Sequence, residues 1–374
     1  MSTSLHDTAF GIAKYYGFEP IDAPKVCPLD LKLSKSIRKS DFVPNNLLSP
    51  LEEKIACVRC LLESGCEQRP ASQFVHAVGD LKDGRCQMHI VGTKQAIAEA
   101  ILMKAVIAVL EHFGAKQLSV RVNSVGAKDA LARFLREVST QSRRFTCDLD
   151  QEGKTLLAKN PMSFISDPRY AHLKYDFPHT LNFLHEESRQ HFEDVLEYLE
   201  TNRIPYEIDP AVLGNPSYSN ETVFEVVDGK GDVLASGSRY NTLARKVGSK
   251  KEMPAIGAVV RLASFKKVVA SPIPNKSSTR VFLVQIGYEA KLKSLQVIDE
   301  LRRARIPVSQ ALAKDRLGAQ LSEAQRLGVP YVLIMGQHEA VRDMVLIRNT
   351  ETRSQDTVPI HDLIPALRRH LSKK

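Results

Sequence analysis

The sequence predicts a protein of two domains, in which an N-terminal domain of mixed helices and strands precedes a smaller C-terminal α/β domain. The chain of 374 residues is long enough for two domains of ordinary size. Its 43% hydrophobic and 25% charged content is normal for a globular protein. Residues 271–279 are rich in Pro and Ser and indicate an exposed linker. We therefore expect a core over residues 1–270, the linker over 271–279 and a second domain over 280–374.

Hydrophobic periodicity predicts the elements of the N-terminal domain. A helix stops at Gly17 and is followed by a short strand that ends at Pro24. Apolar residues recur at helical spacing over residues 96–113, and Gly114 is placed to end that helix. An alternating strand follows over 117–122. The other expected elements are helices over 129–138 and 186–202, strands over 204–208 and 222–227, and a hairpin partner over 233–235.

Strands and helices alternate in the C-terminal domain. The expected strands cover residues 281–286, 308–311, 331–335 and 344–348, and the expected helices cover 291–303, 319–327 and 362–371. This alternation predicts an α/β layer structure with a mostly buried sheet.

Basic charge is concentrated in this second domain. Over residues 280–374, Lys and Arg outnumber Asp and Glu by 16 to 10, so the domain carries +6 of the chain's formal charge of +9. An excess of positive charge favours an anionic partner such as RNA. Charges scattered over a solvated surface are the alternative interpretation.

Composition indicates a cytoplasmic protein that does not span a membrane. The sequence has no run of about 18 apolar residues, and residues 1–7 lack the basic and apolar regions of a signal peptide. Six cysteines without a framework spacing fit a reducing compartment. Cys57 and Cys60 lie in the helix-periodic stretch 54–62, so we expect buried thiols there. No second Cys/His pair has suitable spacing, and we expect no metal site.

Short segments that follow one another along nearly the whole chain carry a family resemblance. They occupy residues 16–24, 122–126, 206–210, 222–225, 237–241 and 254–265. In this order they resemble the histidyl-tRNA synthetase family, which belongs to the class II aminoacyl-tRNA synthetases. The resemblance implies an α+β core with an antiparallel sheet flanked by helices, followed by a small anticodon-binding-like α/β domain. It also implies a homodimer whose interface includes Pro24.

Three positions at which the family carries catalytic arginines hold other residues here. The arginine of the family's Gly-Leu-Glu-Arg-Leu motif corresponds to Ser264, and the preceding glutamate to Ala263. The arginine of its Phe-Arg-x-Glu-Arg-Pro motif falls at Ala77, and that of Arg-Gly-Leu-Asp-Tyr-Tyr at Gly214. Activating histidine with ATP brings two anions together, and cations must neutralise them. We therefore expect no catalytic residues, and ATP and Mg²⁺ as cofactors only if the chain is an active ligase.

The amino-acid pocket implied by the resemblance is also altered. Where the family has Phe-His-Gln-x-Gly-x-Glu, this chain has Ile90 in place of the glutamine and Lys94 in place of the glutamate. Ile90 cannot form a hydrogen bond, and Lys94 is a cation where a carboxylate would meet the substrate ammonium. The residues that remain from the family's pocket signatures are Glu52, Tyr218, Arg239 and Tyr240. Packing residues retained from a shared fold are the alternative interpretation of this set.

The C-terminal domain retains some of the cations expected of an RNA-binding surface. The family helix that faces the anticodon carries adjacent lysines, which are Gly318 and Ala319 here. Lys314, Arg316 and Arg326 remain on or beside this predicted helix. Because phosphate contacts give most of the affinity for RNA, we expect these three residues to contact tRNA or another RNA.

Three functions fit the sequence. The first is a catalytically inactive paralogue that binds tRNA, another RNA or a protein partner, and the missing cations favour it. The second is an active histidine–tRNA ligase with unusual motifs. The third is a regulatory subunit of the ATP phosphoribosyltransferase of histidine biosynthesis. Regulators of that kind usually lack an anticodon-binding domain, so residues 280–374 argue against the third.

Overall fold

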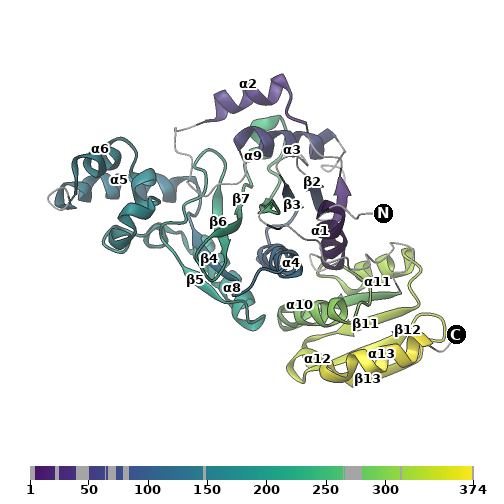
Figure 1. Ribbon diagram of the computed structural model, residues 1–374. Helices are drawn as coiled ribbons and strands as arrows, with labels where there is room; N and C mark the ends of the chain where they lie inside the picture. Colours follow the sequence, from purple (N-terminus) through teal and green to yellow (C-terminus); the bar gives the residue numbers. More distant parts are fainter. Residues whose placement is uncertain are drawn as a thin grey trace.

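The computed structural model describes residues 5–21, 25–38, 50–63, 65, 73–78, 84–145, 149–263, 265, 280–311 and 314–372. The described chain contains an eight-stranded sheet and a five-stranded sheet, each covered by helices (Figure 1). Pro24, Ser264 and the expected linker 271–279 lie outside the described residues.

The larger sheet forms the centre of the N-terminal domain. Its strand order is β1-β2-β3-β8-β7-β6-β4-β5. The strands are β1 (Glu19–Ile21), β2 (Gln73–Val78), β3 (Arg85–Val91), β8 (Ala255–Arg261), β7 (Val233–Arg239), β6 (Asn220–Val227), β4 (Ser119–Ser124) and β5 (Tyr206–Ile208). Pairing is antiparallel from β2 through β4, and only the two edge pairs, β1–β2 and β4–β5, are parallel within the described chain. The expectation of an antiparallel core sheet is confirmed.

One face of this sheet is covered by helix α4 (Ile97–His112). The helix is apolar on nearly all sides because it is enclosed by the sheet, by α1 (Leu5–Ala13) and by α8 (Glu186–Thr201). Met88 and Ile256 of the sheet belong to the same buried cluster as α4. The helix ends where predicted, and Gly114 follows it with a left-handed φ of 93°.

Two helical units flank the opposite face, which we call the open face. The first contains α2 (Pro28–Ile37), α3 (Leu51–Glu63) and α9 (Leu243–Val247), which pack over β3 and the end of β7. The second contains α5 (Lys128–Phe145), α6 (Gln151–Lys159) and α7 (Pro161–Ile165) and projects from the side of the molecule (Figure 1). It has its own apolar cluster around Phe134 and Phe164. The middle of the open face is therefore left between the two units.

The C-terminal domain contains the smaller sheet, in the order β10-β9-β11-β12-β13. Its strands are β9 (Val281–Gln285), β10 (Val308–Gln310), β11 (Tyr331–Met335), β12 (Met344–Asn349) and β13 (Gln355–Pro359), and its helices are α10 (Tyr288–Arg303), α11 (Leu317–Arg326), α12 (Gln337–Val341) and α13 (Leu363–Ser372). The predicted α/β class is confirmed. Strand β13 was not predicted, because its sequence is polar and only Val358 is buried.

Helix α10 joins the two domains along a contact that we call the seam. The helix packs against α4 and α8, and one continuous apolar cluster includes residues of both domains. Tyr16 donates a hydrogen bond to Asp299 of α10 at 2.5 Å, and Lys104 of α4 pairs with the same carboxylate at 3.0 Å. Tyr288 donates to Glu197 of α8 at 2.7 Å. The C-terminal domain is thus fixed to the core by apolar packing and by buried polar contacts.

Asp299 is the electrostatic centre of the seam. Burial would raise the pKa of its carboxyl, but Lys104, the Tyr16 hydroxyl and Arg302 together hold that pKa below its usual value. A carboxyl with a depressed pKa stabilises the fold above the pKa of the unfolded chain, and this contribution is lost as the pH falls through the lower, folded pKa. The seam is therefore expected to weaken in acid.

We predict that Asp299→Asn lowers the free energy of unfolding by about 3 kcal/mol, because it leaves the Lys104 ammonium partly buried without its carboxylate. Urea denaturation at pH 7 measures the change. Asp343→Asn is the matched control, since Asp343 pairs with Lys293 at an exposed position and should cost less than about 1 kcal/mol. Equal losses in the two variants would show that the Asp299 contacts do not hold the seam.

Candidate functional site

The open face of the core sheet bears a cleft of about 1070 Å³. Side chains alternate across a strand, so Ser236 and Ser238 of β7 face this cleft while Arg239 faces α4. Arg121 of β4 and Arg261 at the end of β8 also line it. The cleft is large enough for a small-molecule ligand.

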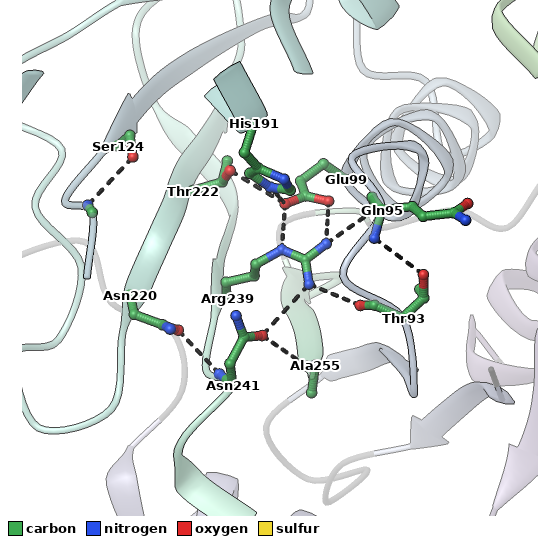
Figure 2. Close-up of polar contacts among 11 residues, drawn as sticks. Thr93, Gln95, Glu99, Ser124, His191, Asn220, Thr222, Arg239, Asn241 and Ala255 are labelled. Atoms are coloured by element: carbon green, nitrogen blue, oxygen red, sulfur yellow. Dashed lines mark hydrogen bonds and ion pairs between the residues drawn. The ribbon is translucent and has the colours of Figure 1, made fainter. Parts of the chain in front are cut away.

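Arg239, one of the four predicted pocket residues, lies on the opposite face of the sheet from the cleft. Its guanidinium is buried and forms a bidentate pair with Glu99 of α4, with Nε–Oε1 at 2.5 Å and Nη2–Oε2 at 2.6 Å (Figure 2). It also donates to the backbone oxygens of Thr93 and Gln95 at 3.0 and 3.1 Å. The side chain therefore ties β7 to α4 and to the segment that precedes it.

Glu99 is held as a carboxylate by this arrangement. His191 of α8 lies 2.7 Å from its Oε1, and Thr222 of β6 donates to the same atom at 3.2 Å (Figure 2). Burial alone would raise the pKa of Glu99, but Arg239 and His191 lower it to about 2. In turn, burial lowers the pKa of His191 and Glu99 raises it, with a net increase. Sequence reasoning did not identify His191, because its place in an ordinary amphipathic helix gives no signal.

Tyr218 and Tyr240 lie together on the open-face side, and a lysine side chain lies against both. The Nζ atom of Lys54 is 4.8 Å from the ring centroid of Tyr240 and 5.9 Å from that of Tyr218. All three residues are buried, with Lys54 only 2% exposed. A cation over the faces of two aromatic rings is attracted by their quadrupoles. The ammonium of Lys54 thus lies close to the rings of both tyrosines.

The ammonium of Lys54 is held in an environment that disfavours its charge. Burial lowers the pKa of Lys54 to about 8, and Cys57 and Glu53 offset only part of this effect. Sequence reasoning treated residues 54–62 as an ordinary buried helix. The signal that could have identified Lys54 is a lysine at a position where the helix repeat expects an apolar residue.

A polar row on β3 adjoins the two tyrosines. Tyr240 Oη lies 2.7 Å from His89 Nδ1 in a hydrogen bond. Gln87 and Arg85, on the same face of β3, donate to Glu53 of α3 at 3.3 Å and 2.6–2.9 Å. These contacts fix α3 on the sheet and thereby place Lys54.

The other predicted pocket positions lie elsewhere. Glu52 accepts hydrogen bonds from Ser34 at 2.9 Å and Arg38 at 3.0 Å, and so joins α3 to α2. Ile90 is buried on the α4 side of the sheet, and Lys94 is exposed. Tyr218 and Tyr240 are thus brought together, while Glu52 and Arg239 take part in separate contacts.

Gly214 stands where the family carries a catalytic arginine, and the backbone there does not favour a side chain. Its φ is 63°, and a Cβ added at this position would lie 2.7 Å from Val223 Cγ1 and 2.8 Å from Ser219 Oγ. A larger residue would strain the backbone at this position and would have to push Val223 and Ser219 aside. Ser264 and the side chain of Ala77, at the other two catalytic positions, lie outside what the structure describes.

Arg261 is a cation of the cleft that sequence reasoning missed. It is exposed and lines the cleft at the end of β8. It occupies the position of the glycine in the family's Gly-Leu-Glu-Arg-Leu motif. Aligning this position with the motif would have revealed the cation, because this chain has an arginine where the motif has a glycine.

The three predicted RNA-contacting residues gather around α11. Glu323 pairs with Arg326 at 2.5 Å and with Lys314 at 3.6 Å. Arg326 and, less strongly, Lys314 lower the pKa of Glu323. Arg316 is exposed at the N-terminal end of the helix. The cluster therefore has three cations, of which two share one carboxylate.

Neither a metal centre nor a membrane span is found in the part of the chain that the structure describes. No group of three or more His, Cys, Asp or Glu side chains is placed there to hold a metal ion. No described helix is long and apolar enough to cross a bilayer. Cys57 is buried in α3, and Cys60 is half-buried.

We predict that the stability of the wild-type protein rises between about pH 8 and pH 10.5 through Lys54. The folded pKa is about 8 and the unfolded pKa about 10.4, so in this range the unfolded chain binds more protons and unfolding becomes harder as pH increases. The gain is on the order of 3 kcal/mol. It is measured as the difference in urea denaturation between the wild type and Lys54→Met, in which the titrating group is absent. If the difference in free energy of unfolding between the wild type and Lys54→Met does not change with pH, the Lys54 ammonium is not buried.

The chain is similar to proteins of known name in both of its domains. Residues 280–370 match the family model described as the anticodon binding domain. A histidine–tRNA ligase of Chlorobium phaeovibrioides is 30% identical over 291 residues, covering 75% of this chain and 68% of that protein. The enzyme of Symbiobacterium thermophilum is 25% identical over 395 aligned positions, covering 96% and 91%. Together with the antiparallel core sheet, these similarities show that the chain belongs to the histidyl-tRNA synthetase family of class II.

Proposed function

We propose that this protein is a histidyl-tRNA synthetase paralogue that binds tRNA or another RNA and does not activate histidine. The observation that carries the proposal is the position of Lys54. Its buried ammonium lies 4.8 and 5.9 Å from the ring centroids of Tyr240 and Tyr218, the tyrosines that the family resemblance assigns to the amino-acid pocket. A histidine substrate would have to displace a buried side chain and place its own cationic group beside a lysine.

The catalytic cations give a second and independent argument. Gly214 has a backbone conformation and close neighbours that disfavour any side chain. Removing one preorganised electrostatic group from an active site typically costs about 3 kcal/mol of transition-state stabilisation. Three such positions have lost their arginine in the sequence. Arg261 supplies one cation on the cleft, but a single relocated charge does not restore a set of groups that act as a unit.

The RNA-binding part of the proposal rests on the C-terminal domain. The domain carries a net charge of +6, matches an anticodon binding domain and presents Lys314, Arg316 and Arg326 around α11. The seam fixes this domain to the core through Asp299. RNA bound at α11 would therefore lie at a defined orientation to the core.

Assembly and location are further parts of the proposal. Strand β1 belongs to the segment that resembles the family's dimer interface, and it lies at the edge of the core sheet. We infer a cytoplasmic homodimer formed through the core with Pro24 in the interface. A protein partner remains the alternative to RNA, and recovery of crosslinked RNA from cells distinguishes the two.

We predict that the purified protein gives no histidine-dependent ATP–pyrophosphate exchange above a no-enzyme blank. Lys54→Thr removes the ammonium beside the two tyrosines, and Ser264→Arg restores one of the three arginines. Each variant should still fail to restore exchange, because the remaining arginine positions lack their cations. An active histidine–tRNA ligase assayed in parallel is the control. Exchange by the unaltered protein would overturn the proposal and establish the active-ligase alternative.

We predict that tRNA binding weakens linearly with salt on a log–log plot and that Lys314→Ala with Arg316→Ala flattens the slope by about two units if both touch phosphate. Arg342→Ala is the matched control, because Arg342 is an exposed cation that follows α12, at the opposite end of the domain from α11 (Figure 1). Filter binding at several salt concentrations measures the slopes. Equal slopes in all variants would mean that α11 does not face the RNA.

A further inference from the structure

A second cavity, of about 680 Å³, lies in the seam between the two domains. Its walls come from α4, from residues 115–118, from residues 202–205 after α8, and from α10. It adjoins the open-face cleft through the loop that contains Lys116 and Gln117, which lines both. A cavity of this size at a domain boundary is a typical place for a small-molecule ligand.

Three cations from three segments surround this cavity. Lys116 and Arg203 are exposed, and neither has an ion pair among the described residues. Arg303 of α10 is 64% exposed and lies 3.8 Å from Asp299 and 3.9 Å from Glu300. Lys104, the fourth cation of the lining, is already paired with Asp299 at 3.0 Å. Lys116 and Arg203 therefore remain available for an anionic group, and the exposed Arg303, at the edge of its two long ion pairs, lies on the same cavity.

The rest of the wall is partly polar and partly apolar. Its carboxylates, Asp299, Glu111 and Glu300, lie 3.0, 3.9 and 3.9 Å from Lys104, Arg302 and Arg303. Ile107, Leu118 and Ile204 contribute apolar surface. Asn202 is buried and lines the cavity, and its Nδ2 donates to the backbone oxygens of Tyr198 and Leu292. Its Oδ1 has no hydrogen-bond donor within the described structure. The Oδ1 atom is enclosed by protein atoms, so Asn202 orders this part of the wall and is not a contact point for a ligand.

We propose that the seam cavity binds a nucleoside monophosphate, with its phosphate on Lys116, Arg203 and Arg303 and its base on the apolar part of the wall formed by Ile107, Leu118 and Ile204. The charges and the apolar surface together favour this class over a simple anion. A ligand in this position contacts both domains and stabilises the seam. This proposal is independent of the proposed RNA binding at α11 and of the cleft on the open face of the sheet.

Arg203 provides a clean test because its backbone has a left-handed φ of 52°. Glycine is favoured in that conformation, so Arg203→Gly removes the cation without straining the fold. Arg305 is a matched control. It is an exposed arginine at the end of α10 with a φ of 59°, and it does not line the cavity. The two variants delete the same side chain from the same backbone conformation.

The experiment is titration calorimetry of the full-length protein and both variants with CMP as the probe. We expect the wild type and Arg305→Gly to bind equally, and Arg203→Gly to bind at least about tenfold more weakly, since a charged hydrogen-bond donor is lost. Saturating CMP at a hundred times Kd should also shift the unfolding equilibrium of the wild type by roughly a hundredfold.

Several results would overturn the proposal. One is the absence of CMP binding at millimolar concentration, and another is equal weakening in the two variants. Inorganic phosphate that binds as tightly as CMP would contradict the role of the apolar wall. If Arg203→Gly weakens tRNA binding while CMP does not bind, the cations contact RNA instead.

Discussion

The buried pair between Arg239 and Glu99 is the contact on which the arrangement of the core depends. It fixes which face of β7 meets α4, because the guanidinium reaches both carboxylate oxygens and two backbone oxygens of the adjoining segment. Side chains alternate in a strand, so this choice sends Ser238 and Tyr240 to the open face. A slip of one residue would exchange these sets and separate the Arg239 guanidinium from the Glu99 carboxylate, and breaking a buried pair costs several kcal/mol.

The contact of Lys54 with the two tyrosines depends on the register of β7, because Tyr240 directly follows this strand. Tyr240 is placed by β7, and Lys54 by α3, which Arg85 and Gln87 of β3 hold through Glu53. Burying the charge of a lysine in this position costs free energy, whereas its contact with the aromatic faces is favourable. The lowered pKa of Lys54, about 8, shows that burial outweighs the nearby compensating charges. The tyrosines that the resemblance assigns to an amino-acid pocket are thus in contact with a buried lysine of the same chain.

Much of the fold could be predicted from the sequence, because long periodic segments specify their own structure. The helix over residues 96–113 and the α/β alternation after residue 280 are examples, and the order of short motifs indicated the antiparallel core. The contacts that decide the site could not be predicted in this way. Arg239 and Tyr240 are adjacent in one motif yet face opposite sides of the sheet. Lys54 contacts Tyr218, which lies 164 positions further along the chain. No local sequence pattern predicts such a contact.

Nuclear magnetic resonance of lysine labelled with ¹³C at Cε measures the titration of the buried Lys54 ammonium directly. We expect one lysine signal that titrates near pH 8, is absent in Lys54→Met, and does not move when histidine is added at millimolar concentration. The ordinary value for a lysine is about 10.4. A Lys54 signal that titrates near that ordinary value, or one that shifts when histidine is added, would show that the pocket is open to substrate.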